Sequence, residues 1–134
     1  MNANQRLLLV TLGELQDILC LLRYLRRHCR GCYLEEVLSH HQNKLMALEW
    51  EGRHLAIQRG LELREGFPIF SPGRRCRTDA RIARCWTVRN RDALNRYRRV
   101  VRGYPLTDPA SVFCRKAMDF SATAIFQMEP FLNI

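Results

Sequence analysis

The chain has 134 residues, of which 47% are hydrophobic and 26% are charged, with seven glycines and five prolines. This composition excludes disordered, collagen-like and low-complexity proteins, and it fits one compact domain over residues 1–134. The 22 basic residues outnumber the 13 acidic ones, and the net charge of +9 favours a partner that carries phosphate or other anions.

The first apolar stretch, residues 7–22, is interrupted by Glu14 and Asp17 and is too short to span a bilayer. The chain also lacks the basic start, uncharged core and small-residue cleavage site of a signal peptide. We therefore expect a cytoplasmic protein without membrane contact, whose six cysteines are thiols in a reducing compartment.

Leucines at alternating spacings of four and three predict an amphipathic helix over residues 4–30. The stripe consists of Leu8, Leu12, Leu15, Leu19, Leu22 and, one heptad later, Cys29. Gly31 is suited to end this helix, and the acids Glu35 and Glu36 favour the start of another.

A second stripe predicts the partner helix over residues 33–59. It consists of Leu34, Leu38, His41, Leu45, Leu48, Gly52 and Leu55. The two helices are expected to form an antiparallel hairpin over residues 4–59 that turns at Arg30 and Gly31, because each stripe can cover the other.

A β-hairpin within residues 46–65 is the alternative for part of the second helix. Leu48 and Trp50 alternate before Gly52, Leu55 and Ile57 alternate after it, and glycine there suits a type II′ turn. The predicted fold class is therefore mainly α, with an α+β protein as the alternative.

Residues 60–77 contain several glycines and prolines and are predicted to be a connector. A basic helical segment over residues 78–103 and a C-terminal helix over residues 108–128 follow. Asp108 is a suitable N-cap for the last helix, Pro109 suits its first position, and the helix is expected to end before Pro130.

The net charge lies in one segment, Arg74–Arg102, which holds eleven arginines and the two acids Asp79 and Asp92. Asn90 is a suitable N-cap and Gly103 a suitable stop for a helix over residues 91–102. One face of this helix would be apolar, and arginines would project from the other. The apolar face consists of Ala93, Leu94, Tyr97, Val100 and Val101.

A helix-turn-helix is a sharper hypothesis for the same segment. Thr78 would cap a short helix that ends at Trp86, residues 87–90 would form the turn, and the arginine helix would enter the groove. The segment is similar to helix-turn-helix sequences in its Ile82-Ala83 pair and in Val88.

The segment departs from the helix-turn-helix pattern at two positions. Thr87 stands in the usual glycine position, and Arg96 stands where an apolar residue is expected. Alternatively, Ile82, Trp86 and Val88 form a strand, which would leave a single basic helix as the binding element.

These features predict a nucleic-acid-binding protein, with DNA favoured over RNA, that acts as a regulatory or accessory factor. Arginine forks bind phosphates or guanine edges, an asparagine binds adenine or phosphate, and Trp86 or Tyr97 would stack on bases if exposed. The expected contact residues are Arg74, Arg75, Arg77, Arg81, Arg84, Arg89, Arg91, Asn95, Arg98, Arg99 and Arg102.

The alternative function is a protein–protein interaction module. In it, the leucine stripes pair with another chain, as a homodimer or an adaptor, and the arginine face docks on an acidic protein partner.

Cys29 and Cys32 have the spacing of a zinc knuckle, with three histidines nearby in the sequence. The weak candidates for metal ligands are His28, Cys29, Cys32, His40 and His41. Because no second pair of cysteines has this spacing, we expect these cysteines to flank the helical turn and His41 to lie in the core, with no cofactor. The chain has no glycine-rich phosphate loop, nucleophile elbow or HExxH motif, and we expect no enzymatic activity.

Overall fold

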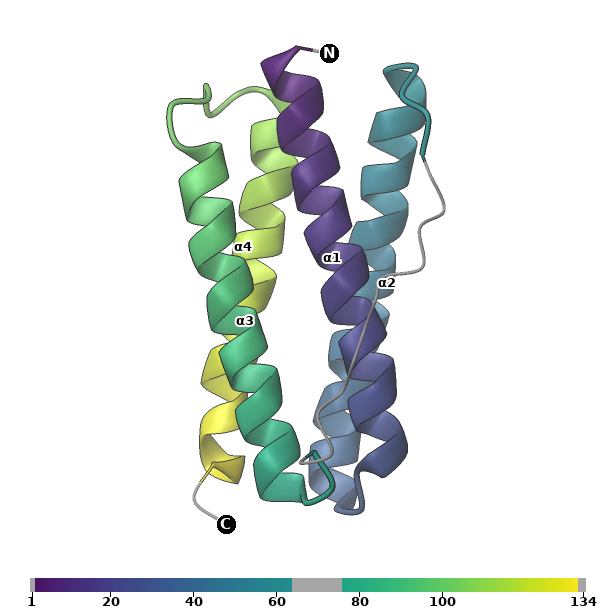
Figure 1. Ribbon diagram of the computed structural model, residues 1–134, viewed down its shortest axis with the longest axis vertical. Helices are drawn as coiled ribbons and strands as arrows, with labels where there is room; N and C mark the ends of the chain where they lie inside the picture. Colours follow the sequence, from purple (N-terminus) through teal and green to yellow (C-terminus); the bar gives the residue numbers. More distant parts are fainter. Residues whose placement is uncertain (1, 64–75, 133–134) are drawn as a thin grey trace.

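The computed structural model describes residues 2–63 and 76–132, whose helices form a bundle (Figure 1). Helix α1 spans Ala3–His28, α2 spans Cys32–Gln58, α3 spans Asp79–Val101 and α4 spans Pro109–Met128. A short 3-10 helix, Glu129–Phe131, follows α4. The mainly α prediction is confirmed, since the described residues contain no strand.

The direction of the helices defines the topology of the bundle. α1 and α2 are antiparallel, as are α3 and α4, while α2 and α3 run in the same direction (Figure 1). The end of α2 and the start of α3 therefore lie at opposite ends of the bundle (Figure 1). Most of the predicted connector, including Arg74 and Arg75, lies outside the described residues.

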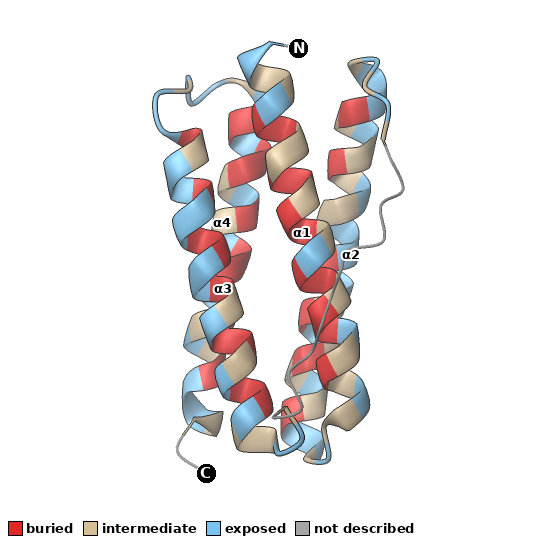
Figure 2. Ribbon diagram, in the orientation of Figure 1, coloured by how far each residue is buried: buried red, intermediate tan, exposed pale blue. Residues whose placement is uncertain are grey.

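The N-terminal helical hairpin is confirmed, and its turn lies between His28 and Cys32. Asn2 begins α1 with a capping box, in which its side chain accepts from the backbone N–H of Gln5 and the Gln5 side chain accepts from the backbone N–H of Asn2. The leucines of the first stripe are buried, so α1 packs through them against the rest of the bundle (Figure 2).

The β-hairpin alternative is wrong, because residues 46–58 are helical. Trp50 and Ile57 are 63% and 64% exposed, whereas Leu48 and Leu55 are partly buried against the core. Over so few residues, apolar side chains two positions apart in a helix give the same sequence pattern as an amphipathic strand. Gly52 is buried where α2 passes closest to Phe113 of α4.

A second buried stripe of α1 was not singled out by the sequence analysis. Its members are Leu7, Thr11, Glu14, Ile18, Leu21 and Leu25. With both stripes buried, α1 contacts each of the three other helices, as α4 also does. Two of the second stripe's members are polar, and one of these, Glu14, is important for the charge on α3.

Helix α3 is continuous, which corrects three predictions about it. The turn at residues 87–90 is absent, the helix begins at Asp79 rather than at residue 91, and Ile82, Trp86 and Val88 are helical. The helix-turn-helix is therefore wrong. Thr78 is the N-cap as predicted, and its hydroxyl accepts from the backbone N–H of Arg81 at 3.3 Å.

Two polar side chains within the predicted turn of α3 bond to the helix itself. The Thr87 hydroxyl donates to the carbonyl oxygen of Ala83 at 2.8 Å, and the Asn90 amide donates to the carbonyl oxygen of Trp86 at 2.9 Å. Both residues are buried, and such bonds to the preceding turn are the usual alternative to capping. After Val101 the helix ends before Gly103, which has the positive φ of 86° expected of a stop residue.

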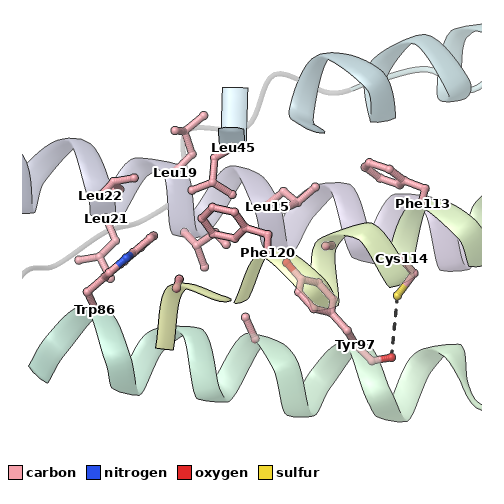
Figure 3. Packing of buried hydrophobic residues seen from close by; sticks show 14 of the residues in the cluster. Leu15, Leu19, Leu21, Leu22, Leu45, Trp86, Tyr97, Phe113, Cys114 and Phe120 are labelled. Carbon is pink, nitrogen blue, oxygen red and sulfur yellow. Dashed lines mark hydrogen bonds between the residues drawn. The ribbon is translucent and has the colours of Figure 1, made fainter. Parts of the chain in front are cut away.

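Helix α4 begins and ends as predicted. The Asp108 carboxylate accepts from the backbone N–H of Ala110 at 2.8 Å, Pro109 occupies the first position, and the helix ends at Met128. The inner face of α4, which includes Phe113, Ala117, Phe120 and Ala124, is buried, and Phe120 meets Trp86 of α3 with ring centroids 6.5 Å apart (Figure 3). None of the described helices combines the length and apolar character needed to cross a membrane.

Candidate nucleic-acid interface

Four arginines form one exposed stripe along α3. At about 100° per residue, they fall within roughly 100° of the helix circumference, and the row is about 26 Å long. The arginine stripe consists of Arg81, Arg84, Arg91 and Arg98, with exposed Val88 and Asn95 between them. Arg99 borders the stripe, and Arg102 continues it as the C-cap of the helix.

The stripe is exposed because the opposite face of α3 is held in the core. Trp86 and Tyr97 are fully buried there, together with Ile82, Ala83 and Ala93. This burial confirms the predicted division of the segment into a packing face and a charged face. It also fixes the axial rotation of α3, so the stripe belongs to a rigid helix of 23 residues rather than to a loop.

The arginines of the stripe lack acidic partners among residues 2–63 and 76–132. Ion pairs in this part of the chain involve other basic residues: Arg26 with Glu35, Arg53 with Glu49, Arg89 and Arg96 with Glu14, and Lys116 with Glu51. Like charges three and four residues apart on a helix repel one another. The stripe is therefore a row of positive charges that have no ion pair within the described part of the chain.

Two other arginines of α3 are paired with an acid of α1. Arg89 and Arg96 each place a guanidinium nitrogen against a different carboxylate oxygen of Glu14, at 2.5 and 3.3 Å. The Glu14 side chain is 3% exposed, and a buried carboxylate requires such partners. Arg89 is therefore bound within the bundle and we leave it out of the interface, although the sequence suggested it as a contact residue.

Asp17 lies one turn along α1 from this ion-paired group. Partial burial, and then the negative charge of Glu14, raise the pKa of the Asp17 carboxyl, while Arg89 and Arg96 oppose that shift. The α1–α3 contact thus gathers two acids and two arginines. In the sequence, the two acids stand out only as interruptions of an apolar stretch, and the place of Glu14 in the second stripe of α1 was the signal that was missed.

The aromatic residues expected to stack on bases are not available. Trp86 and Tyr97 each have 0% exposure, and burial raises the pKa of the Tyr97 phenol well above its usual range. Among the described residues, the most exposed aromatic side chains are those of Tyr33, Trp50 and Phe126, which lie on α2 and α4. The interface on α3 therefore offers guanidinium groups and one amide, Asn95, but no aromatic surface.

Arg77 lies before the first turn of α3 and belongs to a different basic feature. It lines a pocket of about 380 Å³ together with Arg27, His28, Cys29 and Arg30 from the end of α1 and the α1–α2 turn. The basic surface of α3 thus continues to the end of the bundle where α1 ends and α2 begins (Figure 1).

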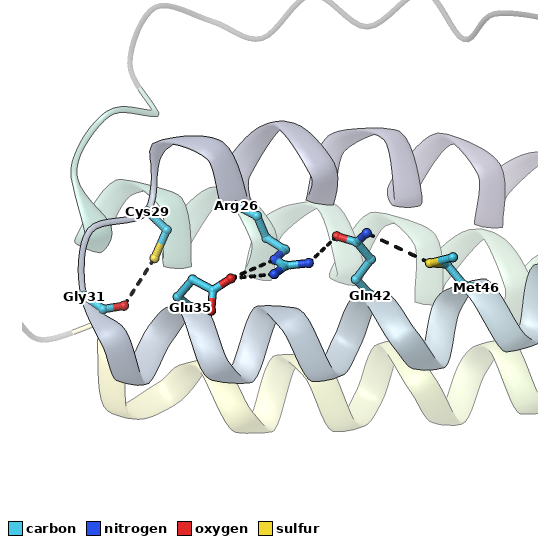
Figure 4. A network of polar contacts seen from close by, with 6 residues as sticks. All are labelled: Arg26, Cys29, Gly31, Glu35, Gln42 and Met46. Carbon is cyan, nitrogen blue, oxygen red and sulfur yellow. Dashed lines mark hydrogen bonds and ion pairs between the residues drawn. The ribbon is translucent and has the colours of Figure 1, made fainter.

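The five weak metal candidates do not converge. His28 packs on the ring of Tyr24 with centroids 4.6 Å apart, the Cys29 thiol donates to the carbonyl oxygen of Gly31, and Cys32 and His40 are exposed (Figure 4). Burial, and then the charge of Asp79, raise the pKa of the Cys29 thiol to about 11. Within the described ranges, no three His, Cys, Asp or Glu side chains are placed to hold a metal ion.

His41 lies in the core, where both of its ring nitrogens have partners. Nδ1 accepts from the indole N–H of Trp86 at 3.0 Å, which leaves Nε2 to donate to the side-chain oxygen of Gln127 at 2.6 Å. Burial lowers the pKa of this imidazole. The neutral histidine joins α2, α3 and α4, in agreement with the expectation that it lies in the core.

Comparisons with known proteins support the fold. No protein-family model matches the chain, and no curated protein matches it. The chain is similar to the crystal structure of rv2844, a conserved hypothetical protein from Mycobacterium tuberculosis, with a TM-score of 0.77 and 15% sequence identity. The similarity covers 98% of this chain and 91% of the other. At this identity it establishes a shared helical fold and nothing about activity.

Proposed function

We propose that the protein binds nucleic acid through the arginine stripe of α3. The observation that carries this proposal is the absence of acidic partners for Arg81, Arg84, Arg91 and Arg98 among the described residues, beside two arginines of the same helix that are paired with Glu14. Unpaired guanidinium groups in a row are suited to phosphate, which they bind bidentately.

The continuous helix favours contact with the phosphate backbone over reading of bases. A helix-turn-helix inserts the start of its second helix into the major groove, whereas the start of α3 is joined to the α1–α2 turn by Asp79. Phosphate contacts supply affinity without sequence information. An accessory protein that binds many sequences fits this surface better than a regulator of one site.

Duplex DNA is the form of nucleic acid that we favour. Proteins that bind single strands usually stack bases on exposed aromatic side chains, and the aromatic residues of α3 are buried. A straight, rigid row about 26 Å long is better matched to the regular backbone of a duplex. The affinity for double-stranded RNA of the same sequence is the measurement to compare with the affinity for duplex DNA.

The proposal is tested by the salt dependence of binding to a short DNA duplex, measured by fluorescence anisotropy. The variant R91Q/R98Q should reduce the slope of log affinity against log salt by about two, because each lost phosphate contact contributes about 0.9. The control R6Q/R23Q removes the same charge from exposed positions on α1 and should leave the slope nearly unchanged. Equal effects of the two variants, or binding that does not respond to salt, would overturn the proposal.

Exposed apolar residues on α2 favour a protein–protein interaction as the second candidate function. Met46, Trp50 and Ile57 are 44%, 63% and 64% exposed and share one outward face of the helix. The leucine stripes cannot serve this role as first expected, since they are largely buried within the bundle. Light scattering tests self-association: a dimer that W50A converts to a monomer supports this candidate, and a monomer at all concentrations removes the homodimer.

A further inference from the structure

The pocket at the end of the bundle combines three arginines from two distant segments. Arg27 and Arg30 come from the end of α1 and its turn, and Arg77 precedes α3. His28 and Cys29 complete the lining of this space of about 380 Å³. None of the three arginines has an ion pair within the described part of the chain, in contrast to neighbouring Arg26, which Glu35 and Gln42 hold on α2 (Figure 4).

Asp79 explains why these arginines are brought together. One of its carboxylate oxygens accepts from the backbone N–H of Arg30 at 2.9 Å, and the other accepts from that of Gly31 at 2.6 Å. These bonds fasten the α1–α2 turn to the first residue of α3 and so place Arg77, two residues earlier, beside Arg30. Both oxygens bond backbone amides, and no ion pair joins Asp79 to the arginines of the pocket.

The charge of the pocket matches a phosphate monoester. Three guanidinium groups and the carboxylate of Asp79 leave a net charge of about two positive, and a phosphate monoester is close to a dianion at neutral pH, whereas a backbone phosphodiester carries one negative charge. The thiol of Cys29 adds no charge, because burial keeps it protonated, and the second nearby acid, Glu35, is paired with Arg26. A concave site also suits a group at a chain end, which has one ester link rather than two.

We propose that this pocket binds a phosphate monoester, as the terminal phosphate of a nucleic-acid strand that lies along the arginine stripe. The assignment of the monoester to the end of a nucleic-acid strand rests on the proposed function. The phosphate chemistry depends only on the pocket. Arg27, Arg30 and Arg77 would hold the phosphate oxygens, with His28 as a further donor at the wall.

The first experiment compares two forms of one DNA hairpin, with a 5′-phosphate or a 5′-hydroxyl at its single end, by fluorescence anisotropy at about 0.15 M salt. We expect the phosphorylated form to bind about tenfold more tightly, as several charge-assisted hydrogen bonds allow. The variant R27Q/R30Q/R77Q should remove this preference. The control R84Q/R91Q/R98Q should weaken both forms equally and retain the ratio.

A second experiment does not depend on nucleic-acid binding. Methyl phosphate, a monoester, and dimethyl phosphate, a diester, are titrated while the backbone amide signals of Arg30 and Gly31 are followed by NMR. Methyl phosphate should shift these signals with saturation, dimethyl phosphate should have little effect, and R27Q/R30Q/R77Q should abolish the response.

The outcomes separate the two proposals. Equal binding of both DNA forms without a methyl phosphate response overturns the pocket proposal and leaves the stripe proposal standing. A methyl phosphate response without any DNA binding supports the phosphate site, overturns its strand-end assignment and overturns the proposed function. A methyl phosphate response with equal DNA binding identifies a site for free monoesters and overturns only the strand-end assignment.

Discussion

The indole N–H of Trp86 donates a 3.0 Å hydrogen bond to Nδ1 of His41, and this bond determines which nitrogen of the buried His41 ring carries the proton. Because Nδ1 accepts, the imidazole is neutral and carries its proton on Nε2, which bonds Gln127. Both His41 and Trp86 are buried, and Phe120 packs on the imidazole edge-on with centroids 5.7 Å apart. A second proton on the ring would break the bond to Trp86.

This arrangement makes stability depend on pH. Burial lowers the pKa of His41 in the folded state below its ordinary value of 6.5, so the unfolded chain binds a proton first as the pH falls. The contribution of His41 is complete above about pH 6.5 and decreases between that pH and the lowered folded-state pKa. Urea unfolding at a series of pH values from about 8 to 5 should show this loss.

Two variants test whether His41 causes the loss of stability at low pH. H41Q should be less stable at pH 8 by about 1–3 kcal/mol, because an amide group does not place an acceptor and a donor where the two ring nitrogens meet Trp86 and Gln127, and it should show a weaker decline with acid. H54Q changes an exposed histidine elsewhere on α2 and should follow the wild-type curve. If the stability of H41Q fell with pH as steeply as that of the wild type, another group would be responsible for the pH dependence.

Gly52 and Gly13 both lie in helices, but only Gly52 is crowded by neighbouring side chains, so the pair tests the packing of the bundle. An added methyl group at Gly52 would lie 2.5 Å from a ring carbon of Phe113 and 3.0 Å from Leu12, while one at Gly13 meets nothing within 4 Å. G52A should therefore destabilise by about 1–3 kcal/mol, since overpacking exceeds the gain in helix propensity. G13A should stabilise by roughly 0.5–1 kcal/mol. Thermal unfolding of both variants measures the difference, and stabilisation by G52A would contradict the close packing of α2 on α4.

The free thiols should differ widely in reactivity. Cys32 is exposed at the start of α2, Cys114 is fully buried, and burial raises the pKa of Cys29 to about 11 and that of Cys85 to about 12. Thiolates are the reactive form, so a disulfide reagent at about pH 7.5 should modify Cys32 first. C32S should remove the fast phase and C114S should not. Fast modification of Cys114 would show that α3 and α4 separate readily.

The parts of the fold that were predicted correctly are those determined by local pattern. The leucine stripes of α1 and α2, the glycine at their turn and the Asp108-Pro109 start of α4 act within a few residues, and each has one favourable structure. The break in α3 was predicted wrongly because Asn90 has the side chain of a capping residue. Whether such residues cap a helix or bond within it depends on burial by other helices, which the local sequence does not contain.

The sequence placed the charge on the correct segment, but it did not show which arginines of α3 are paired within the bundle and which face solvent. Arg89 and Arg84 look alike in the sequence, and they differ because Glu14 lies 75 residues from Arg89 on an adjacent helix. That pairing could be anticipated only by knowing that α1 and α3 are neighbours. The same holds for the pocket, where Arg30 and Arg77 meet through the bonds of Asp79 to the turn.

The Glu14 ion pairs provide a final prediction. E14Q keeps the shape of the side chain but removes the charge that holds Arg89 and Arg96, whose side chains are 27% and 53% exposed. Because both arginines can turn toward water, the cost should be lower than for a fully buried pair, about 1–2 kcal/mol. E49Q, which disrupts the more exposed pair with Arg53, should cost less than about 1 kcal/mol. Urea unfolding of both variants at neutral pH tests this order, and a smaller loss in E14Q than in E49Q would contradict the role of Glu14 in joining α1 to α3.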